Sequence, residues 1–183
     1  EPVPDLEFQC VNFSLDTYME GLHKHPGFMF NFFVCRPDSR GEIKLRDPEG
    51  RETPRIFANY LSDERDVKRM VRGFQMSRQI IGTEPFKSFV AEEIRPGPAC
   101  QTDDDFIAYM REVASTVYHP CGTCTMGTSA KAVVDPELRV RGLEGLSVMD
   151  ASVMPMVPSS NIHPATIMVA ERAAEMVAKD LKA

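Results

Sequence analysis

Two histidines in the second half of the chain stand where the local sequence could present an imidazole to a ligand. His119 opens a loop in which proline and glycine fix the backbone and small residues allow another group to approach closely. His163 precedes Pro164 at the expected start of the last helix, where unpaired backbone N–H groups and the positive end of the helix dipole favour an anion. Imidazoles in these places could act as general bases. The residues alone leave two alternatives open: a hydrogen-bonded structural role for His119, and a helix cap formed by Asn161 or His163.

The five cysteines offer a second kind of chemistry. Cys121 and Cys124 form a C-x-x-C pair, which occurs in redox dithiols and in zinc sites. No second C-x-x-C and no H-x-x-x-H pair accompanies them, so we expect no metal site and favour a structural role. An odd cysteine count in a chain of 183 residues is not typical of a disulfide framework, so we expect reduced thiols in a cytoplasmic protein.

The composition argues against several classes of partner. The formal net charge is −6 and no run of five basic residues occurs, which argues against nucleic acid and against an anionic membrane. No apolar stretch approaches the roughly 20 residues that span a bilayer, so no membrane span is expected. The chain has no G-x-G-x-x-G motif, no P-loop and no G-x-S-x-G motif, and therefore no recognisable cradle for nucleotide phosphates.

The elements that must position these residues begin with strands and two helices. Apolar and polar residues alternate over 6–10, 28–34 and 43–45, which predicts an antiparallel sheet with one packed face.

The two helices are expected after these strands. The first is capped by Ser62 or Asp63 and ends at Gly82, with apolar residues at helical spacing between them. A Thr102–Asp105 capping box starts the second helix, which runs over about 103–115.

The second half is expected to be mostly loop. Residues 118–131 are rich in glycine, threonine, serine and cysteine, 146–149 form a short apolar strand, and 150–161 form a turn region. A final helix begins near Pro164 and runs to about Leu181. So small a segment would bury little surface by itself, so we expect it to dock on another part of the protein.

Four ordered blocks of this half resemble the C-terminal signature of the glucose–methanol–choline (GMC) oxidoreductase family. Two earlier segments, Pro4–Phe8 and Arg36–Gly41, are similar to strands of the family's substrate domain, so the resemblance covers nearly the whole chain. The first block is most similar to bacterial choline-dehydrogenase-like members. The four blocks are Tyr118–Gly127, Val134–Leu146, Val148–Pro155 and Ser160–Glu171.

The resemblance implies an α/β fold with two parts. Residues 1–117 would form an α+β substrate-binding domain, and 118–183 would complete an FAD-binding Rossmann-like domain. It also implies FAD as the cofactor, bound through a glycine-rich motif that this chain lacks, so we expect a second polypeptide or the other piece of a cleaved chain to carry that motif. The expected flavin contacts are the backbone around Asp150, Ala151, His163, Pro164 and Ala165, with a turn-capping carboxylate as the alternative role of Asp150.

The family carries a histidine–histidine or histidine–asparagine pair at the flavin, and here the pair falls on His119 and His163. The resemblance implies oxidation of a small-molecule alcohol by hydride transfer to flavin N5. His119 would be the base that accepts the hydroxyl proton, and His163 would hydrogen-bond the same oxygen. Because His119 must be neutral, activity is expected to fall in acid. Phe30 and Phe32 are candidates for a wall of the substrate pocket.

Two other functions stay open at this point. Some relatives cleave hydroxynitriles without net redox, so a lyase on the same scaffold is one alternative. The other is a non-catalytic subunit that only binds its partner.

Overall fold

The computed structural model describes residues 3–16 and 21–180. The chain divides into two compact units. The first comprises the chain up to Val34 together with Asp63–Thr116, and the second comprises Cys35–Ser62 together with the chain from Val117 onward. Residues 35–62 are thus grouped with the C-terminal segment. The roles expected for 1–117 and 118–183, in substrate and flavin binding, stay predictions.

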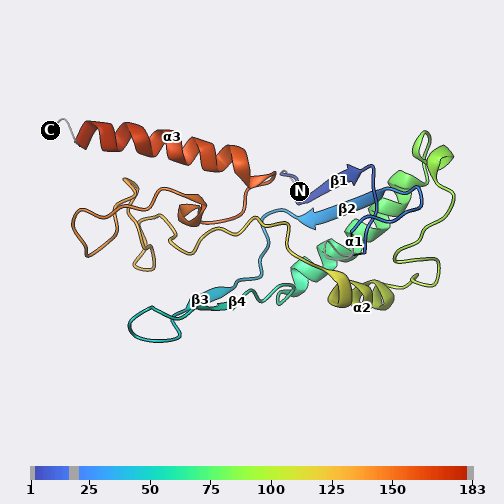
Figure 1. Cartoon of the computed structure of the whole chain (residues 1–183), viewed down its shortest axis with the longest axis horizontal. Helices are drawn as coiled ribbons and strands as arrows, with labels where there is room; N and C mark the ends of the chain where they lie inside the picture. The colour runs from blue at the N-terminus through green and yellow to red at the C-terminus, as the bar shows by residue number, and fades with distance from the viewer. Residues whose placement is uncertain (1–2, 17–20, 181–183) are drawn as a thin grey trace. The chain divides into compact units, whose positions relative to one another are not determined.

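The first unit contains an antiparallel pair of strands, β1 (Leu6–Val11) and β2 (Met29–Val34) (Figure 1). The register places Leu6 opposite Val34 and continues without interruption along both strands. Both strands lie where the alternation of apolar and polar residues predicts them.

One face of this pair carries an aromatic cluster. Phe8 contacts Phe30 and Phe32, with ring centroids 5.6 and 5.9 Å apart. Phe32 meets Phe74 edge-on at 4.9 Å, and Phe30 meets Phe86 edge-on at 5.8 Å. Phe30 and Phe32 thus pack within this cluster, and a part in a wall of the substrate pocket stays a prediction for both.

Helix α1 (Glu64–Ile81) begins and ends as its sequence predicts. The Asp63 side chain accepts the backbone N–H of Arg65 at 2.9 Å and so caps the helix. Gly82 is the C-terminal cap, and its N–H donates to the last turn.

The short 3₁₀ helix η1 (Phe86–Phe89) leads into a loop and then into α2 (Asp103–Val113). The predicted capping box is present: Asp105 N donates to Thr102 Oγ1 at 3.2 Å, and Thr102 N donates to Asp105 Oδ2 at 2.8 Å. The helix ends two residues before the predicted Ser115, where the backbone becomes extended at Ala114.

Helix α2 packs on α1 through aromatic rings. Phe106, which is buried, stacks on Phe74 with ring centroids 5.0 Å apart and an interplanar angle of 7°. This stack joins both helices to the aromatic face of the strand pair.

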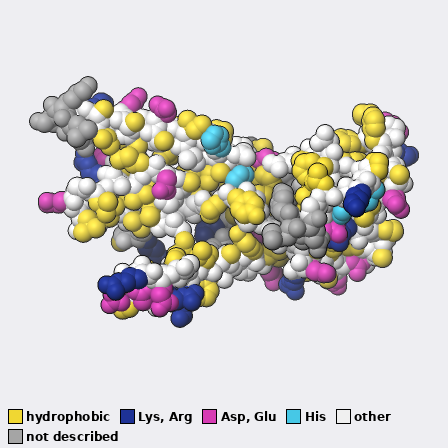
Figure 2. Space-filling model, viewed as in Figure 1, with side chains coloured by type: hydrophobic (Ala, Val, Ile, Leu, Met, Phe, Trp, Pro, Cys, Tyr) yellow, Lys and Arg dark blue, Asp and Glu magenta, His cyan; other side chains and the backbone are white. Residues whose placement is uncertain are grey.

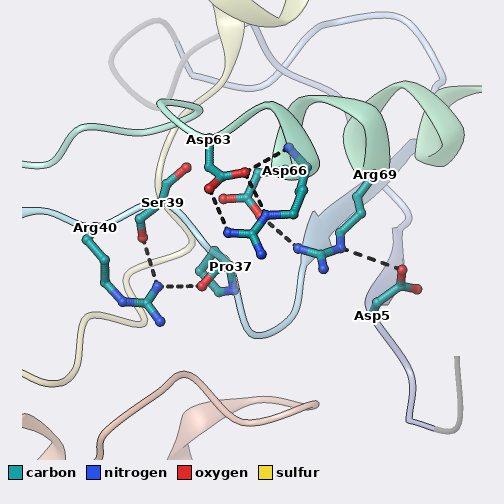
Figure 3. Close-up of polar contacts among 8 residues, drawn as sticks. Asp5, Pro37, Ser39, Arg40, Asp63, Asp66 and Arg69 are labelled. Carbon is teal, nitrogen blue, oxygen red and sulfur yellow. Dashed lines mark hydrogen bonds and ion pairs between the residues drawn. The ribbon is translucent and has the colours of Figure 1, made fainter.

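Charged side chains fix the start of α1 within the same unit (Figure 3). Arg65 donates to both carboxylate oxygens of Asp63, at 3.0 and 2.8 Å. Arg69 donates to the buried carboxylate of Asp66 at 3.0 Å and lies 3.9 Å from Asp5. Hydrogen bonds from Arg65 hold the pKa of Asp63 far below its usual value. The network links the first turn of α1 to the segment before β1.

The second unit contains a small ribbon of β3 (Glu42–Lys44) and β4 (Arg55–Phe57), paired antiparallel. All residues of both strands are exposed. The prediction of one packed face is therefore wrong for this segment, because strands of three residues leave both faces of the ribbon open.

The core of the second unit forms around α3 (Ile162–Asp180), the long helix at the C-terminal end of Figure 1. The predicted start at Pro164 is two residues late, and the predicted end at Leu181 lies outside the described residues. None of the helices within 3–16 and 21–180 is long and apolar enough to cross a bilayer. The buried residues of this core are Val134, Leu138, Val153, Met154, Ile162, Val169 and Ala173.

The predicted strand over 146–149 is wrong. Ser147 forms an isolated bridge with Arg139, flanked by hydrogen bonds from Val140 N to Leu146 O at 2.9 Å and from Val148 N to Leu138 O at 3.1 Å. The pairing stops after this bridge, so the segment is part of a tight connection and not a strand.

Candidate active site

The loop that begins at His119 is held to a buried turn by backbone hydrogen bonds. Cys124 N donates to Ser152 O at 3.0 Å, and Met126 N donates to Val153 O at 2.8 Å. His119 itself is half-buried. These two bonds hold residues 124–126 of the loop against the turn.

The backbone conformations of Gly122 and Tyr118 shape the same loop. Gly122 has φ of 87°, and a Cβ at this position would lie 3.4 Å from Met154 O. The Thr125 hydroxyl donates to Gly122 O and closes the turn. Tyr118, directly before His119, has φ of 60°, which is uncommon for a residue other than glycine. The positive φ of Gly122 and the closeness of Met154 O explain why this position of the loop requires glycine.

The turn that receives this loop is the 3₁₀ helix η2 (Ala151–Val153). Asp150 Oδ1 accepts the N–H of Ser152 at 2.7 Å and caps the turn. Hydrogen bonds from Ser152, first from its side chain and then from its backbone, lower the pKa of the Asp150 carboxyl. The side chain of Asp150 thus has the turn-capping role, while contact of its backbone with a cofactor stays a prediction.

His163 is the second residue of α3. Its backbone N–H donates to Asn161 Oδ1 at 3.0 Å, so Asn161 caps the helix and His163 does not. The side chain of His163 is exposed, as is Pro164, and Ala165 is half-buried. The sequence offered Asn161 and His163 as alternatives for the cap, and the structure selects Asn161.

A shared hydrophobic core brings the three segments together. Val153 of η2 and Ile162 of α3 belong to this core, and Cys121, Ala151 and Ala165 pack against it. The loop, the turn and the helix start are therefore neighbours in one unit. Convergence of the His119 and His163 imidazoles at one point stays a prediction.

The start of α3 differs from the other long helices in its charge. The first turns of α1 and α2 contain carboxylates, among them Glu64 and Asp103, whereas the first turn of α3 contains none. The positive end of this helix dipole is thus not neutralised by an acidic side chain of its own first turn. An electron-rich ligand group placed there would be stabilised.

The structure describes both thiols of the C-x-x-C pair. Cys121 and Cys124 are free thiols, and burial raises the pKa of the Cys121 thiol. A raised pKa lowers the thiolate fraction that redox chemistry needs. In the part of the chain that the structure describes, no group of three or more histidine, cysteine, aspartate or glutamate side chains could hold a metal ion.

Sequence reasoning missed two features of the site. One is the pairing of residues 124–126 with 152–153, and the other is the left-handed backbone of Tyr118. Backbone hydrogen bonds between loops depend little on side-chain type, so no residue pattern predicts them. Tyrosine is not a residue that marks a left-handed conformation.

Comparison with known proteins identifies the family of this chain. A model of the GMC oxidoreductase family matches residues 37–170. The chain therefore belongs to the GMC oxidoreductase family, and the resemblance to its C-terminal portion is confirmed.

Two curated relatives cover nearly all of the chain. The alcohol dehydrogenase (acceptor) of Pseudomonas putida is 40% identical over 180 residues, which are 96% of this chain and 32% of that protein. The oxygen-dependent choline dehydrogenase of Cronobacter sakazakii is 36% identical over 174 residues, which are 95% of this chain and 31% of that protein. The chain thus spans about a third of the length of these relatives.

Solved structures show the same fold. Pyridoxine 4-oxidase from Mesorbium loti matches 94% of this chain and 34% of its own, with a TM-score of 0.83 and 30% identity. A variant of formate oxidase from Aspergillus oryzae, studied for modification of its FAD, matches 87% of this chain and 28% of its own, with a TM-score of 0.79 and 28% identity. These matches confirm the predicted α/β fold class.

Proposed function

We propose that the chain is the C-terminal portion of an FAD-dependent enzyme that oxidises a small-molecule alcohol by transferring hydride from the alcohol carbon to flavin N5. The observation that carries this proposal is the joining of the His119 loop, the η2 turn and the start of α3 on one core. The relatives named as alcohol and choline dehydrogenases support the type of reaction.

The residues at the start of α3 fit a flavin. When bound, FAD supplies the hydride acceptor and an electron-rich ring edge. The first turn of α3 would stabilise such an edge, because it contains no carboxylate. The exposed Pro164 and the small side chains of Ala151 and Ala165 allow close approach, and the Asp150 carboxylate is occupied by Ser152. These residues, with His163, would hold the cofactor.

The imidazoles of His119 and His163 have different roles at the substrate hydroxyl. His119 accepts the hydroxyl proton as the hydride leaves the carbon, which requires a neutral imidazole before the reaction. His163 hydrogen-bonds the same oxygen and orients the carbon. The hydrogen bonds that tie residues 124–126 to η2 hold the loop that carries this base, and an ordered loop lowers the entropic cost of reaching the reactive geometry.

The proposed enzyme requires a motif for the FAD phosphates that lies outside these 183 residues. The chain contains no glycine-rich dinucleotide motif and spans about a third of its relatives. We propose that a second polypeptide, or the other piece of a cleaved chain, carries the motif that binds the FAD phosphates.

Anaerobic mixing of the assembled, FAD-loaded protein with alcohols tests the proposal. The flavin absorbance should bleach with the wild type, and His119→Ala should slow bleaching by at least about 100-fold while FAD stays bound. His25→Ala, which removes an exposed loop histidine of the first unit, is the matched control and should bleach as the wild type does.

Three outcomes would contradict the proposal. Unchanged bleaching by His119→Ala would remove this residue from the base role. Carbonyl release without bleaching would indicate a lyase. A flavin that no alcohol bleaches would leave the chain with a partner-binding role only.

A further inference from the structure

A groove with a volume of about 530 Å³ lies between α1 and α2, the adjacent helices of the first unit (Figure 1). Its floor is apolar. Val67 and Val71 stand one helical turn apart on α1, and Ile107 of α2 lines the same space. Val71 is buried, whereas Val67 and Ile107 are half-buried. Sites for small molecules have volumes of about 300–1,000 Å³ and mostly apolar walls, so the groove has the size and the floor of such a site.

Two basic side chains of α1 form one rim of the groove. Lys68 and Arg72 are four residues apart, so they project from the same side of the helix and can reach one anionic group together. Both side chains are exposed, and neither forms an ion pair with any residue that the structure describes. Arg78 of the same helix, by contrast, is paired with Glu93 at 2.7 Å. The rim therefore presents positive charge beside an apolar floor.

A hydrogen bond between the helices closes one end of the groove. Gln75 Nε2 donates to Asp103 Oδ1 at 3.1 Å, and both residues line the groove. Gln75 follows Lys68 by seven residues, which is about 10 Å along the helix axis. Asp103 thus has a donor, and it stands in the first turn of α2, where the helix dipole stabilises its charge. Its carboxylate repels an anion from this end and favours the end at Lys68.

We propose that this groove binds a small amphipathic organic anion, in which a carboxylate is attached to a compact apolar group. The carboxylate lies against Lys68 and Arg72, and the guanidinium can donate two parallel hydrogen bonds to it. The apolar group covers Val67, Val71 and Ile107 and removes part of their area from water. The residues of the groove have no role in the proposed reaction, so the inference does not rest on the proposed function.

A free small molecule fits the groove better than an acidic helix of a protein partner. A docked helix is held by anchors over two turns or more, and it needs a groove that continues past both of its ends. Here the apolar floor of α1 spans only the turn from Val67 to Val71. The bond from Gln75 to Asp103 closes the groove one turn later. A compact ligand with one charged end matches this short floor.

Three probes separate the charged part of the site from the apolar part. Calorimetry gives the Kd of 3-phenylpropanoate, 3-phenylpropylammonium and acetate for the assembled, FAD-loaded protein. The wild type should bind 3-phenylpropanoate at least about tenfold more tightly than either of the others, because the ammonium is repelled by the rim and acetate has no apolar group.

Charge variants assign that binding to the rim. The double variant Lys68→Gln, Arg72→Gln should weaken 3-phenylpropanoate by about tenfold or more, because it removes both cations of the rim. The double variant Lys87→Gln, Lys131→Gln is the matched control. It removes the same charge from exposed positions outside the groove and should bind as the wild type does.

Methyl NMR of the wild type gives a measurement that holds even if the rim variant does not fold. Addition of 3-phenylpropanoate should shift the δ1-methyl resonance of Ile107, assigned with Ile107→Val. The methyl resonance of Ile162, in the core of the second unit, should stay in place. A shift at Ile162 without one at Ile107 would assign the binding to the candidate active site and overturn the inference.

Three further results would overturn it. The first is no preference of the wild type for 3-phenylpropanoate over the other two probes. The second is an equal loss of binding in the rim variant and in its matched control, which would indicate a general effect of charge. The third is an acidic amphipathic peptide that shifts the Ile107 methyl while 3-phenylpropanoate does not, which would make the groove a docking surface for a protein. Bleaching of the flavin by alcohols tests the proposed function separately from all of these.

Discussion

Asn161 determines where α3 begins, and with it the position of His163. Its side chain accepts the N–H of His163 at 3.0 Å, so Asn161→Ala removes a helix cap. We expect the free energy of unfolding to fall by about 1 kcal/mol, measured by denaturant unfolding. Asn161→Ser keeps a capping oxygen and should retain most of the stability. Equal stability of the alanine variant and the wild type would show that the cap is unimportant here.

The thiols of the C-x-x-C pair give a second test at the residue scale. Burial raises the pKa of the Cys121 thiol, which keeps it protonated at neutral pH. We therefore expect the double variant Cys121→Ser, Cys124→Ser to bleach the flavin with alcohol at a rate within about threefold of the wild type, because Cys121 packs against the hydrophobic core and neither thiol takes part in the proposed reaction. A variant that retains FAD and loses bleaching would instead support a dithiol in the reaction.

At the scale of elements, helix-capping residues and the alternation of apolar and polar residues predicted the structure well. Asp63 and Thr102 start their helices where the sequence places them, because capping depends on a side chain and its nearest backbone. The alternation over β1 and β2 also held, because one face of that pair packs against helices.

Among the predictions about elements that were wrong are the start of α3 and the packed face of the β3–β4 ribbon. Pro164 predicted the start of α3 because proline suits the first helical position. Proline is also tolerated elsewhere in the first turn, and the Asn161 cap starts the helix two residues earlier, at Ile162. The ribbon of β3 and β4 alternates without a buried face. The motifs located the loop, the turn and the helix of the candidate site, but the backbone bonds that join them follow from packing of the whole unit.

The capping box of α2 predicts how stability depends on acidity. Hydrogen bonds from the backbones of Thr102 and Gln101 lower the pKa of Asp105 below its usual value of 3.8. A carboxylate with a lowered pKa stabilises the fold at pH above its unfolded-state value, and this contribution is lost as the pH falls through the folded-state pKa.

Asp105→Asn should therefore lower the melting temperature at neutral pH and reduce the further loss on acidification, measured from about pH 7 to pH 2. Asp104→Asn, in the same first turn but outside the box, is the matched control. Identical acid profiles for the two variants would show that the box does not contribute.

At the scale of the whole molecule, the second unit leaves large apolar side chains exposed to solvent. Large apolar side chains of this unit remain open, among them Leu143 with 60%, Met156 with 52% and Met168 with 66% exposed. Figure 2 shows hydrophobic side chains gathered at the surface of the face in view. Contiguous apolar surface on a protein indicates an interaction site. We expect the companion polypeptide of the proposed enzyme to cover part of it.

Assembly should therefore change how the chain binds a hydrophobic dye. The chain alone is expected to enhance the fluorescence of anilinonaphthalene sulfonate, and addition of the companion polypeptide should reduce that signal as apolar surface is buried. Met168→Lys, an exposed change on α3, should weaken assembly by about tenfold or more without altering the circular dichroism of the chain alone, whereas Glu171→Lys, a charge change on the same helix, should weaken it less. If the dye signal persists after assembly and Met168→Lys assembles as the wild type does, the open surface of α3 has another partner, and the companion must attach through the first unit.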